Sequence, residues 1–258
     1  SCWTASPRPW ASRGAPVLAG PIALVANEPA TWGAPRLVEH APYRVSVEGQ
    51  GLLGRIALEY QTLMEFDGMV RCDLTLSPPP GGAHLQSLTI QIPVPRSVAT
   101  WYRKPTCADW SGEPWDEPTF VPYGWLGNED RGLSWFMESE ANWRVQAGHP
   151  YLTLRPEGDA IMVRLHLISQ PTPLDRQLSY TIGFQATPVR PLDPNLYARR
   201  WAPGPYVAGV NLFVYGWPKQ ISDLTGRLLA RDPDHQRAFV DSWRARGVET
   251  LSYTCAQC

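Results

Sequence analysis

Two adjacent pairs of carboxylic acids are the residues of this sequence whose types and spacing would suit glycoside hydrolysis. They are Asp116-Glu117 and Glu129-Asp130. Cleavage of a glycosidic bond usually needs an acid and a second carboxylate about 5–10 Å apart. The first pair falls in a loop rich in Pro and Trp and is predicted to be solvated. The second falls in a turn, where Asp and Asn side chains satisfy local N–H groups. For this second pair, a structural turn or an interdomain contact is therefore predicted in preference to catalysis.

The second pair belongs to a twelve-residue run, residues 125–136. Arg131 in this run is predicted to pair with a carboxylate or with backbone carbonyl groups. Replacing Arg131 with Ala would then leave a partner unsatisfied, and we expect a loss of about 1–3 kcal/mol in stability.

The cysteines and histidines do not form a recognisable metal or redox site. Cys255 and Cys258 have the spacing of half a zinc site, but no second pair or histidine cluster accompanies them. The five cysteines are odd in number and widely spread, which predicts a mostly reduced state. The sequence also lacks a His-Glu-x-x-His motif, a Gly-x-Ser-x-Gly elbow and a phosphate-binding loop. No metal and no cofactor is therefore predicted.

Residues 49–54 match the glycine pattern of dinucleotide-binding loops. That chemistry requires a helix to begin at the glycines, so that its N-terminal N–H groups meet a pyrophosphate. The residues that follow alternate with period two instead. A glycine-rich hairpin turn is therefore the favoured interpretation.

The twelve tryptophans are candidates for sugar contacts, because a flat apolar ring complements the C–H face of a sugar. Burial of one Trp removes roughly 200 Å² from water, so core packing is the default for most of them. Trp217 is the best candidate for a ligand contact, since it lies just past a strand predicted to open a barrel. Tyr215, at the end of the same strand, is the second predicted substrate-binding residue.

Period-two alternation predicts the elements that position these residues. Ile56, Leu58 and Tyr60 alternate with Glu59 and Gln61, which indicates a strand with one buried face. Asp67-Gly68 then predicts a hairpin turn. Further strands are predicted at 70–76, 88–94, 133–138, 151–155, 161–167 and 178–186. Residues 43–186 are therefore expected to form one antiparallel two-sheet β-sandwich.

The pattern changes after residue 187, where five prolines fall within eighteen residues and predict a linker. Residues 207–215 are nearly all apolar, as in a strand buried on both faces. Asp232-Pro233-Asp234 predicts a helix start, Gly247 a helix stop, and residues 248–254 a second, parallel strand. The predicted division is a sandwich over 1–187, a linker over 188–206 and the first βαβ unit of a (β/α)₈ barrel over 207–258.

The charge balance argues against polyanionic partners. The formal net charge is −1, from 23 Lys and Arg against 24 Asp and Glu, so no global field attracts nucleic acid. No stretch reaches the roughly 18 continuous apolar residues of a membrane span. Neither nucleic acid nor a membrane is expected as a partner.

Several segments together resemble glycoside hydrolase family 123 and its relatives. The most specific is the run over 125–136, and the others are 18–22, 65–69, 92–94 and 185–191. Their order and spacing are similar to that family's N-terminal sandwich domain, over roughly residues 17–258.

The resemblance implies a longer parent protein in which a sandwich precedes a (β/α)₈ catalytic barrel. Characterised relatives act as β-N-acetylgalactosaminidases, in which an Asp-Glu pair assists attack by the substrate's own acetamido oxygen. That pair would lie beyond Cys258, so no residue here inherits those roles, and we expect a chain truncated at both ends. The expected function is the non-catalytic portion of a glycoside hydrolase, with carbohydrate as partner. The alternative is a non-catalytic carbohydrate-binding or structural β-sandwich protein.

Overall fold

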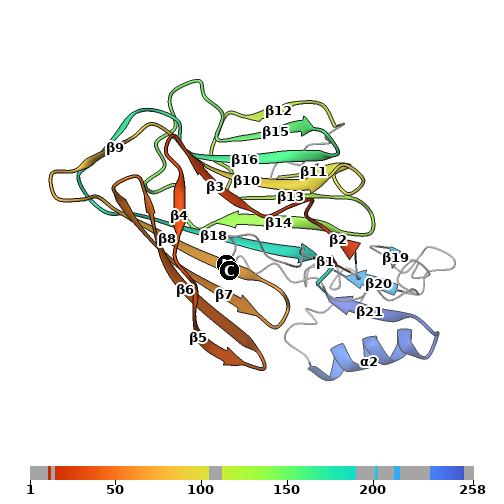
Figure 1. Cartoon of the computed structure of the whole chain (residues 1–258). Helices are drawn as coiled ribbons and strands as arrows, with labels where there is room; N and C mark the ends of the chain where they lie inside the picture. The colour runs from red at the N-terminus through yellow and green to blue at the C-terminus, as the bar shows by residue number, and fades with distance from the viewer. Residues whose placement is uncertain are drawn as a thin grey trace. The chain divides into compact units, whose positions relative to one another are not determined.

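The computed structural model describes residues 11–12, 15–104, 112–189, 201–202, 212–215 and 233–252. The chain divides into two compact units, Ser1–Pro191 and Leu192–Cys258 (Figure 1). This division falls within the region predicted from its prolines to be a linker.

The first unit contains a nine-stranded sheet in which every pair of neighbouring strands is antiparallel. Its order is β11 (Trp101–Arg103), β13 (Tyr123–Gly127), β14 (Gly132–Met137), β18 (Leu178–Thr187), β8 (Val70–Ser77), β7 (Ile56–Glu65), β6 (Arg44–Leu53) and β4 (Ala30–Trp32). The strand β5 (Arg36–Ala41) also pairs with β6.

A five-stranded antiparallel sheet accompanies it in the same unit. Its order is β12 (Trp115–Glu117), β15 (Leu152–Glu157), β16 (Ala160–Ile168), β10 (Leu88–Pro95) and β3 (Ala23–Ala26). Two short ribbons complete the described strands of the first unit: β1 (Ala11–Ser12) with β2 (Ala15–Pro16), and β9 (Ala83–Leu85) with β17 (Thr172–Leu174).

Both large sheets contribute to a single hydrophobic core. Leu74 and Ile182 enter it from the nine-stranded sheet, and Ile90 and Val163 from the five-stranded sheet, each at most 1% exposed. The predicted alternation is present, since buried and exposed residues alternate along β7 and β8. The prediction of a mainly β, antiparallel fold is confirmed, and the two sheets around one core are consistent with a β-sandwich.

The turn between β7 and β8 confirms the Asp67-Gly68 hairpin prediction. The Glu65 N–H donates to the Met69 carbonyl at 2.9 Å, and the Met69 N–H donates to Asp67 Oδ1 at 3.0 Å. Gly68 has a φ of 84°, which a residue with a Cβ rarely adopts. The local sequence therefore determines where this strand reverses.

The interpretation of residues 49–54 as a turn is wrong for most of the segment. Gly49 and Gly51 lie inside strand β6, and only Gly54, with a φ of 57°, lies in the turn to β7. A Cβ on Gly49 would come within 2.5 Å of the Tyr60 ring, and one on Gly51 within 2.2 Å of the Thr31 carbonyl oxygen. These glycines therefore permit close packing. No helix begins there, so the dinucleotide interpretation is excluded.

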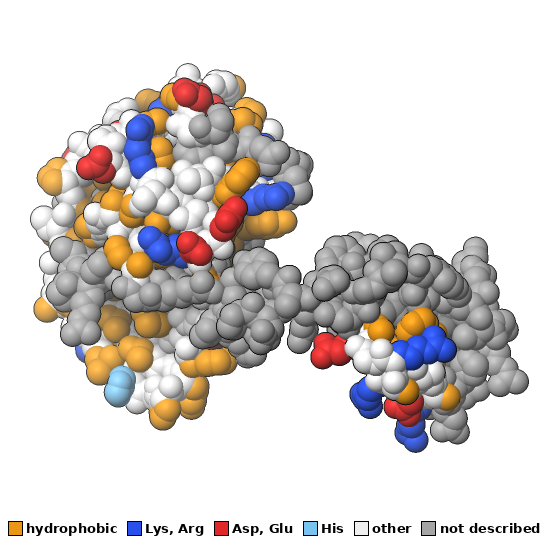
Figure 2. Space-filling model, turned by 90° about the vertical axis from the view of Figure 1, so that its right-hand side faces the viewer, with side chains coloured by type: hydrophobic (Ala, Val, Ile, Leu, Met, Phe, Trp, Pro, Cys, Tyr) orange, Lys and Arg blue, Asp and Glu red, His pale blue; other side chains and the backbone are white. Residues whose placement is uncertain are grey.

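Charged side chains of both signs are mixed on the visible face of the first unit, as Figure 2 shows. This distribution agrees with the formal net charge of −1. No helix in the described ranges is long and apolar enough to span a membrane.

The second unit contains parallel strands β19 (Trp201–Ala202), β20 (Leu212–Tyr215) and β21 (Glu249–Ser252), in that order. Helix α2 (Pro233–Arg244) lies between β20 and β21 in the chain, and the φ of Gly247 is 75°. The predicted succession of strand, helix and parallel strand is thus confirmed. The strands and the helix described in this unit do not show a barrel.

Candidate functional site

The two predicted substrate-binding residues belong to the second unit. Tyr215 is the last residue of β20, but its side chain is outside the described part of the structure. Trp217 lies outside the described residues altogether. Their role remains a prediction, and the structure points to a different place in the first unit.

That place is an interruption in the edge of the nine-stranded sheet. Strands β4 and β5 pair with the same edge of β6, β4 at residues 51–53 and β5 at residues 44–48. Residues 33–35 separate them, and the Gly33 N–H donates to the Gln50 carbonyl at 2.8 Å. Pro35 has no N–H with which to continue the ladder. The sequence Gly33-Ala34-Pro35 therefore breaks the edge strand opposite the middle of β6.

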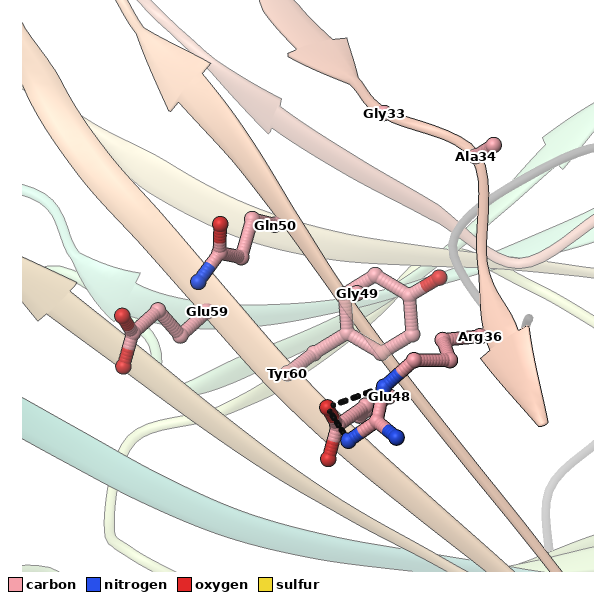
Figure 3. Close-up of a pocket in the computed structure, with 8 residues that line it drawn as sticks. All are labelled: Gly33, Ala34, Arg36, Glu48, Gly49, Gln50, Glu59 and Tyr60. Carbon is pink, nitrogen blue, oxygen red and sulfur yellow. Dashed lines mark hydrogen bonds and ion pairs between the residues drawn. The ribbon is translucent and has the colours of Figure 1, made fainter. Parts of the chain in front are cut away.

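A cavity of about 560 Å³ lies at this interruption, and we call it the sheet-edge pocket. Its lining residues are Gly33, Ala34, Arg36, Glu48, Gly49, Gln50, Glu59 and Tyr60 (Figure 3). The Arg36 Nε donates to Glu48 Oε1 at 2.9 Å, and the two side chains form an ion pair. Arg36 is therefore held at one end of the pocket with its charge already matched.

Tyr60 forms a wall of the sheet-edge pocket from the inner side of β7. It is only 3% exposed, and its hydroxyl has no hydrogen-bond partner in the protein. Its ring lies against Gly49, and the Trp32 ring meets it edge-on at 5.4 Å between centroids. In the view of Figure 3 the hydroxyl is on the side of Ala34 and Arg36.

A second hollow, of about 470 Å³, adjoins the sheet-edge pocket. The two share Gly33, Gln50 and Glu59. The second is lined in addition by Thr31, Trp32, Gly51, Leu52, Ala57 and Leu58. The strand register places Gln50 and Glu59 on the exposed face of the sheet, whereas Trp32, like Tyr60, lies on the face that packs against the core.

No group of His, Cys, Asp and Glu suitable for a metal ion occurs within the described part of the chain. No local sequence pattern predicts the sheet-edge pocket, because its polar residues come from three strands whose register only the fold determines. The nearest local signal is the pair of glycines in β6, Gly49 and Gly51, since they mark where Tyr60 and Thr31 lie close to the strand.

The prediction that Asp116-Glu117 is solvated is wrong for Glu117. Glu117 is 3% exposed, and its Oε2 lies 2.6 Å from Nζ of Lys104, which also faces the Trp115 ring. Asp116 pairs with Arg155 at the surface. Because successive side chains of a β-strand point to opposite sides, Asp116 and Glu117 lie on opposite sides of β12, and only Glu117 is buried.

Tyr102 lies next to this buried ion pair. Its ring stacks on Trp135 with 6.1 Å between centroids, and its hydroxyl has no hydrogen-bond partner. Burial raises the pKa of the Tyr102 phenol, and the charge of Glu117 raises it further. The phenol is therefore neutral at physiological pH, which agrees with a role in packing.

Glu129 and Asp130 lie in the turn between β13 and β14, as predicted. Asn128 organises this turn, since its Oδ1 accepts from the N–H groups of Asp130 and Arg131, both at 2.9 Å. The predicted pairing of Arg131 is not found in the structure. Its Nε is buried without a hydrogen-bond partner. The side chain of Asn128 accepts hydrogen bonds from the backbone N–H groups of the turn, so the Arg131 side chain is not required to close it.

Among the histidines of the described residues, His166 has the most strongly shifted pKa. Thr89 Oγ1 lies 3.4 Å from its Nδ1 and Thr153 Oγ1 lies 3.2 Å from its Nε2. Burial lowers its pKa to about 4, and the nearby His149, Arg164 and Arg155 act in the same direction. His166 is therefore neutral at pH 7.

The expectation of reduced cysteines is wrong for Cys72, which is disulfide-bonded. Cys72 is 1% exposed in the core strand β8, and the other four cysteines lie outside the described residues. An odd number of cysteines in a chain does not prevent one pair from forming.

No protein-family model and no curated protein matches this sequence. Among solved structures, Slr1438 from Synechocystis sp. PCC 6803 is similar with a TM-score of 0.43 and 12% identity. That similarity covers 67% of this chain and 85% of Slr1438. HI1317 is similar with a TM-score of 0.38 and 9% identity, over 65% of this chain and 74% of HI1317. Neither similarity is close enough to identify a function.

Proposed function

We propose that this chain is the non-catalytic portion of a glycoside hydrolase, a β-sandwich followed by the first βαβ unit of a (β/α)₈ barrel. Its parent would resemble a β-N-acetylgalactosaminidase that uses substrate-assisted hydrolysis. This proposal rests first on the resemblance of residues 125–136 and four further segments to glycoside hydrolase family 123.

One observation supports it most directly, which is the change from antiparallel to parallel strand pairing along the chain. The first unit has two antiparallel sheets around one core, whereas β20, α2 and β21 form a parallel strand–helix–strand unit. Parallel sheets need covering helices and several neighbouring strands. A sandwich followed by such a unit is the order expected of the proposed parent.

The two adjacent carboxylate pairs have structural roles, which agrees with catalysis elsewhere in the parent. Glu117 is buried against Lys104, and Asp116 pairs with Arg155. Glu129 and Asp130 lie in a turn closed by Asn128. A glycosidase needs an acid within hydrogen-bond reach of the leaving oxygen and a second group on the opposite side of the bond.

The test compares the 258-residue chain with the longer protein that the resemblance implies. Both are incubated with a chromogenic β-N-acetylgalactosaminide, and release of the chromophore is followed. The short chain should show no turnover and the longer protein should hydrolyse the substrate. Turnover by the short chain that disappears in Glu129→Ala or Asp130→Ala would place the active site in the first unit and contradict the proposal.

The second candidate is a non-catalytic carbohydrate-binding β-sandwich protein. The observation in its favour is the cavity at the edge of the nine-stranded sheet, which Arg36, Glu48, Gln50 and Glu59 line with polar side chains. The two candidates differ in the longer protein. If it binds sugars but hydrolyses none of a panel of chromogenic glycosides, the binding function replaces the hydrolytic one.

A further inference from the structure

We propose that the outer side of strands β11, β13 and β14 binds a neutral oligosaccharide that lies along the strands. This inference rests on the proposed carbohydrate function and assigns it a site in the first unit. The three strands are neighbours at one edge of the nine-stranded sheet (Figure 1). Four aromatic residues form what we call the aromatic face: Trp101, Tyr123, Trp125 and Phe136.

The strand register places all four rings on the side of the sheet that faces away from the core. The residues that alternate with them are at most 1% exposed: Tyr102, Leu126 and Trp135. Successive side chains of a strand point to opposite sides, so the aromatic residues lie on the outer side. Tyr123 is directly opposite Phe136. Trp101 is opposite Gly127, which lies two residues along β13 from Trp125 and therefore on the same side.

Trp125 lies flat on this face. A Cβ on Gly127 or on Gly132 would collide with its indole, so the ring covers both glycines. The Trp125 Nε1 donates to Thr187 Oγ1 at 2.8 Å. Because its N–H is already bonded, the indole offers a ligand its outward π-face, which attracts the weakly positive C–H groups of a sugar ring. Trp101, opposite Gly127 and 45% exposed, adds a second indole beside it.

A second aromatic pair lies further along the same strands. The Phe136 ring lies over Gly183 of β18, where a Cβ would collide with it. Tyr123, opposite Phe136, is 52% exposed. Gly132, under the indole, and Phe136 are four residues apart on β14, which corresponds to about 14 Å along a strand. That is longer than one sugar ring, so the two aromatic pairs would contact different units of one oligosaccharide.

Polar side chains lie between the two aromatic pairs, on the same side of the sheet. Ser134 is opposite both Trp125 and Gln185, and Arg103 is also opposite Trp125. Their hydroxyl, amide and guanidinium groups can donate hydrogen bonds to sugar hydroxyls. A proline-rich peptide would instead require a groove between aromatic side chains, whereas the indole of Trp125 lies flat. Flat rings with polar groups between them favour a carbohydrate.

The test measures binding of two probes to the whole 258-residue chain by calorimetric titration and saturation-transfer NMR. One probe is a neutral tetrasaccharide that ends in β-N-acetylgalactosamine, and the other is methyl N-acetyl-β-galactosaminide. The tetrasaccharide should bind more tightly, because only it reaches both aromatic pairs. Trp101→Ala and Tyr123→Ala each remove a largely exposed ring and should weaken its binding about tenfold or more, as truncation of an important aromatic contact does.

Matched controls remove exposed apolar side chains elsewhere in the first unit. Tyr43 and Leu37 are 59% and 58% exposed and lie at or next to β5, which pairs with β6 near the other end of the strand order. Tyr43→Ala and Leu37→Ala should bind like the wild type. Thermal unfolding of every variant shows whether its fold is kept.

Three results would overturn the inference. The first is a wild-type chain that does not bind the tetrasaccharide. The second is binding that Trp101→Ala and Tyr123→Ala leave unchanged, or that the controls weaken equally. The third is equal affinity for the two probes, which would contradict a site that extends along the strands.

The inference and the proposed function fail in different ways. If the longer protein hydrolyses the chromogenic glycoside but the 258-residue chain does not bind the tetrasaccharide, the inference is wrong and the proposed function stands. If the chain binds through the aromatic face but the longer protein is inactive, the inference stands together with the carbohydrate-binding alternative.

Discussion

Two buried tyrosines differ in whether the hydroxyl has a partner. The Tyr180 hydroxyl donates to the Asn142 carbonyl at 2.9 Å, whereas the Tyr102 hydroxyl has no partner. Tyr180→Phe should therefore destabilise the protein by about 1 kcal/mol, and Tyr102→Phe should be neutral or stabilising. Urea unfolding of both variants measures the difference. Equal losses would mean that the Tyr102 hydroxyl has an interaction that the structure does not show.

The ion pair between Glu117 and Lys104 should contribute far more to stability than an exposed pair. Lys104→Met leaves a carboxylate that is 3% exposed without its partner, at a cost of about 3–5 kcal/mol. Arg36→Met breaks a pair whose side chains are 70% and 40% exposed, and should cost less than about 1 kcal/mol.

The double variant Lys104→Met/Glu117→Leu should recover most of the stability lost in Lys104→Met. It removes the buried carboxylate as well as its partner, so no uncompensated charge remains. Denaturant midpoints of the wild type and the three variants check both expectations. A double variant as unstable as Lys104→Met would show that packing, and not the unpaired charge, dominates.

His166 should make the stability of the first unit depend on pH. Its pKa is lowered from 6.5 to about 4 in the folded protein, so the unfolded chain binds a proton first as the pH falls. The contribution of neutral His166 is fully present above about pH 6.5 and decreases towards pH 4. The charged and titratable groups around it are His149, Arg164, Arg155 and Asp116.

The measurement is the free energy of unfolding between pH 7 and pH 4 for the wild type and His166→Gln. One pKa unit corresponds to about 1.4 kcal/mol, so the wild type should lose up to about 3 kcal/mol more than the variant over this range. Parallel curves for the two proteins would contradict the lowered pKa.

At the scale of single elements, the hairpin of β13 and β14 depends on two glycines that lie under the indole of Trp125. A Cβ on Gly132 would come within 2.7 Å of this ring and 2.8 Å of the Gly127 Cα. Gly132→Ala should therefore destabilise the protein by about 1–3 kcal/mol, as overpacking does. It should also disturb the hydrogen bond from Trp125 Nε1 to Thr187 Oγ1, now 2.8 Å.

Ser134→Ala is the control for this prediction, because Ser134 lies on the same strand and on the same face as Gly132. Its effect should stay within about 0.5 kcal/mol. Thermal unfolding and the tryptophan emission spectrum report on both variants. If Gly132→Ala has the stability of the control, the strand has room to move away from the indole.

Strands with a clean alternation could be predicted from the sequence, because one side of each faces the core. This holds for β7, β8, β10 and β16, whose burial follows period two. Helix α2 and the parallel strand after it were predictable from Asp232, Pro233 and Gly247, which mark where a helix begins and ends. These signals are local, and the structure agrees with those at Pro233 and Gly247, whereas Asp232 lies outside the described residues.

The sheet edge could not be predicted, because β3, β4 and β5 are short and irregular. A register shift between Leu37 and Glu39 breaks the alternation of β5, and most of its side chains are exposed. The sheet-edge pocket depends on these strands and was missed with them. Burial of Glu117 was missed for a different reason, since the sequence around it does not reveal Lys104 as a partner.

At the scale of the whole molecule, the first unit should be stable without the second. Every buried hydrophobic residue of the described core lies between Val17 and Phe184, and the division of units falls after Pro191. A chain ending at Pro191 should keep the near-ultraviolet circular dichroism of the first unit and unfold in one cooperative transition. A non-cooperative transition would mean that the second unit is needed for the fold.

The interrupted edge of the nine-stranded sheet also affects how the protein behaves at high concentration. Leu37 and Val38 are 58% and 45% exposed, and a continuous edge strand with such side chains would recruit strands from other molecules. Pro35 and the register shift after Leu37 leave no long row of regularly spaced N–H and C=O groups for a new strand to extend. We therefore expect the break at this edge to limit growth of the sheet into fibrils as well.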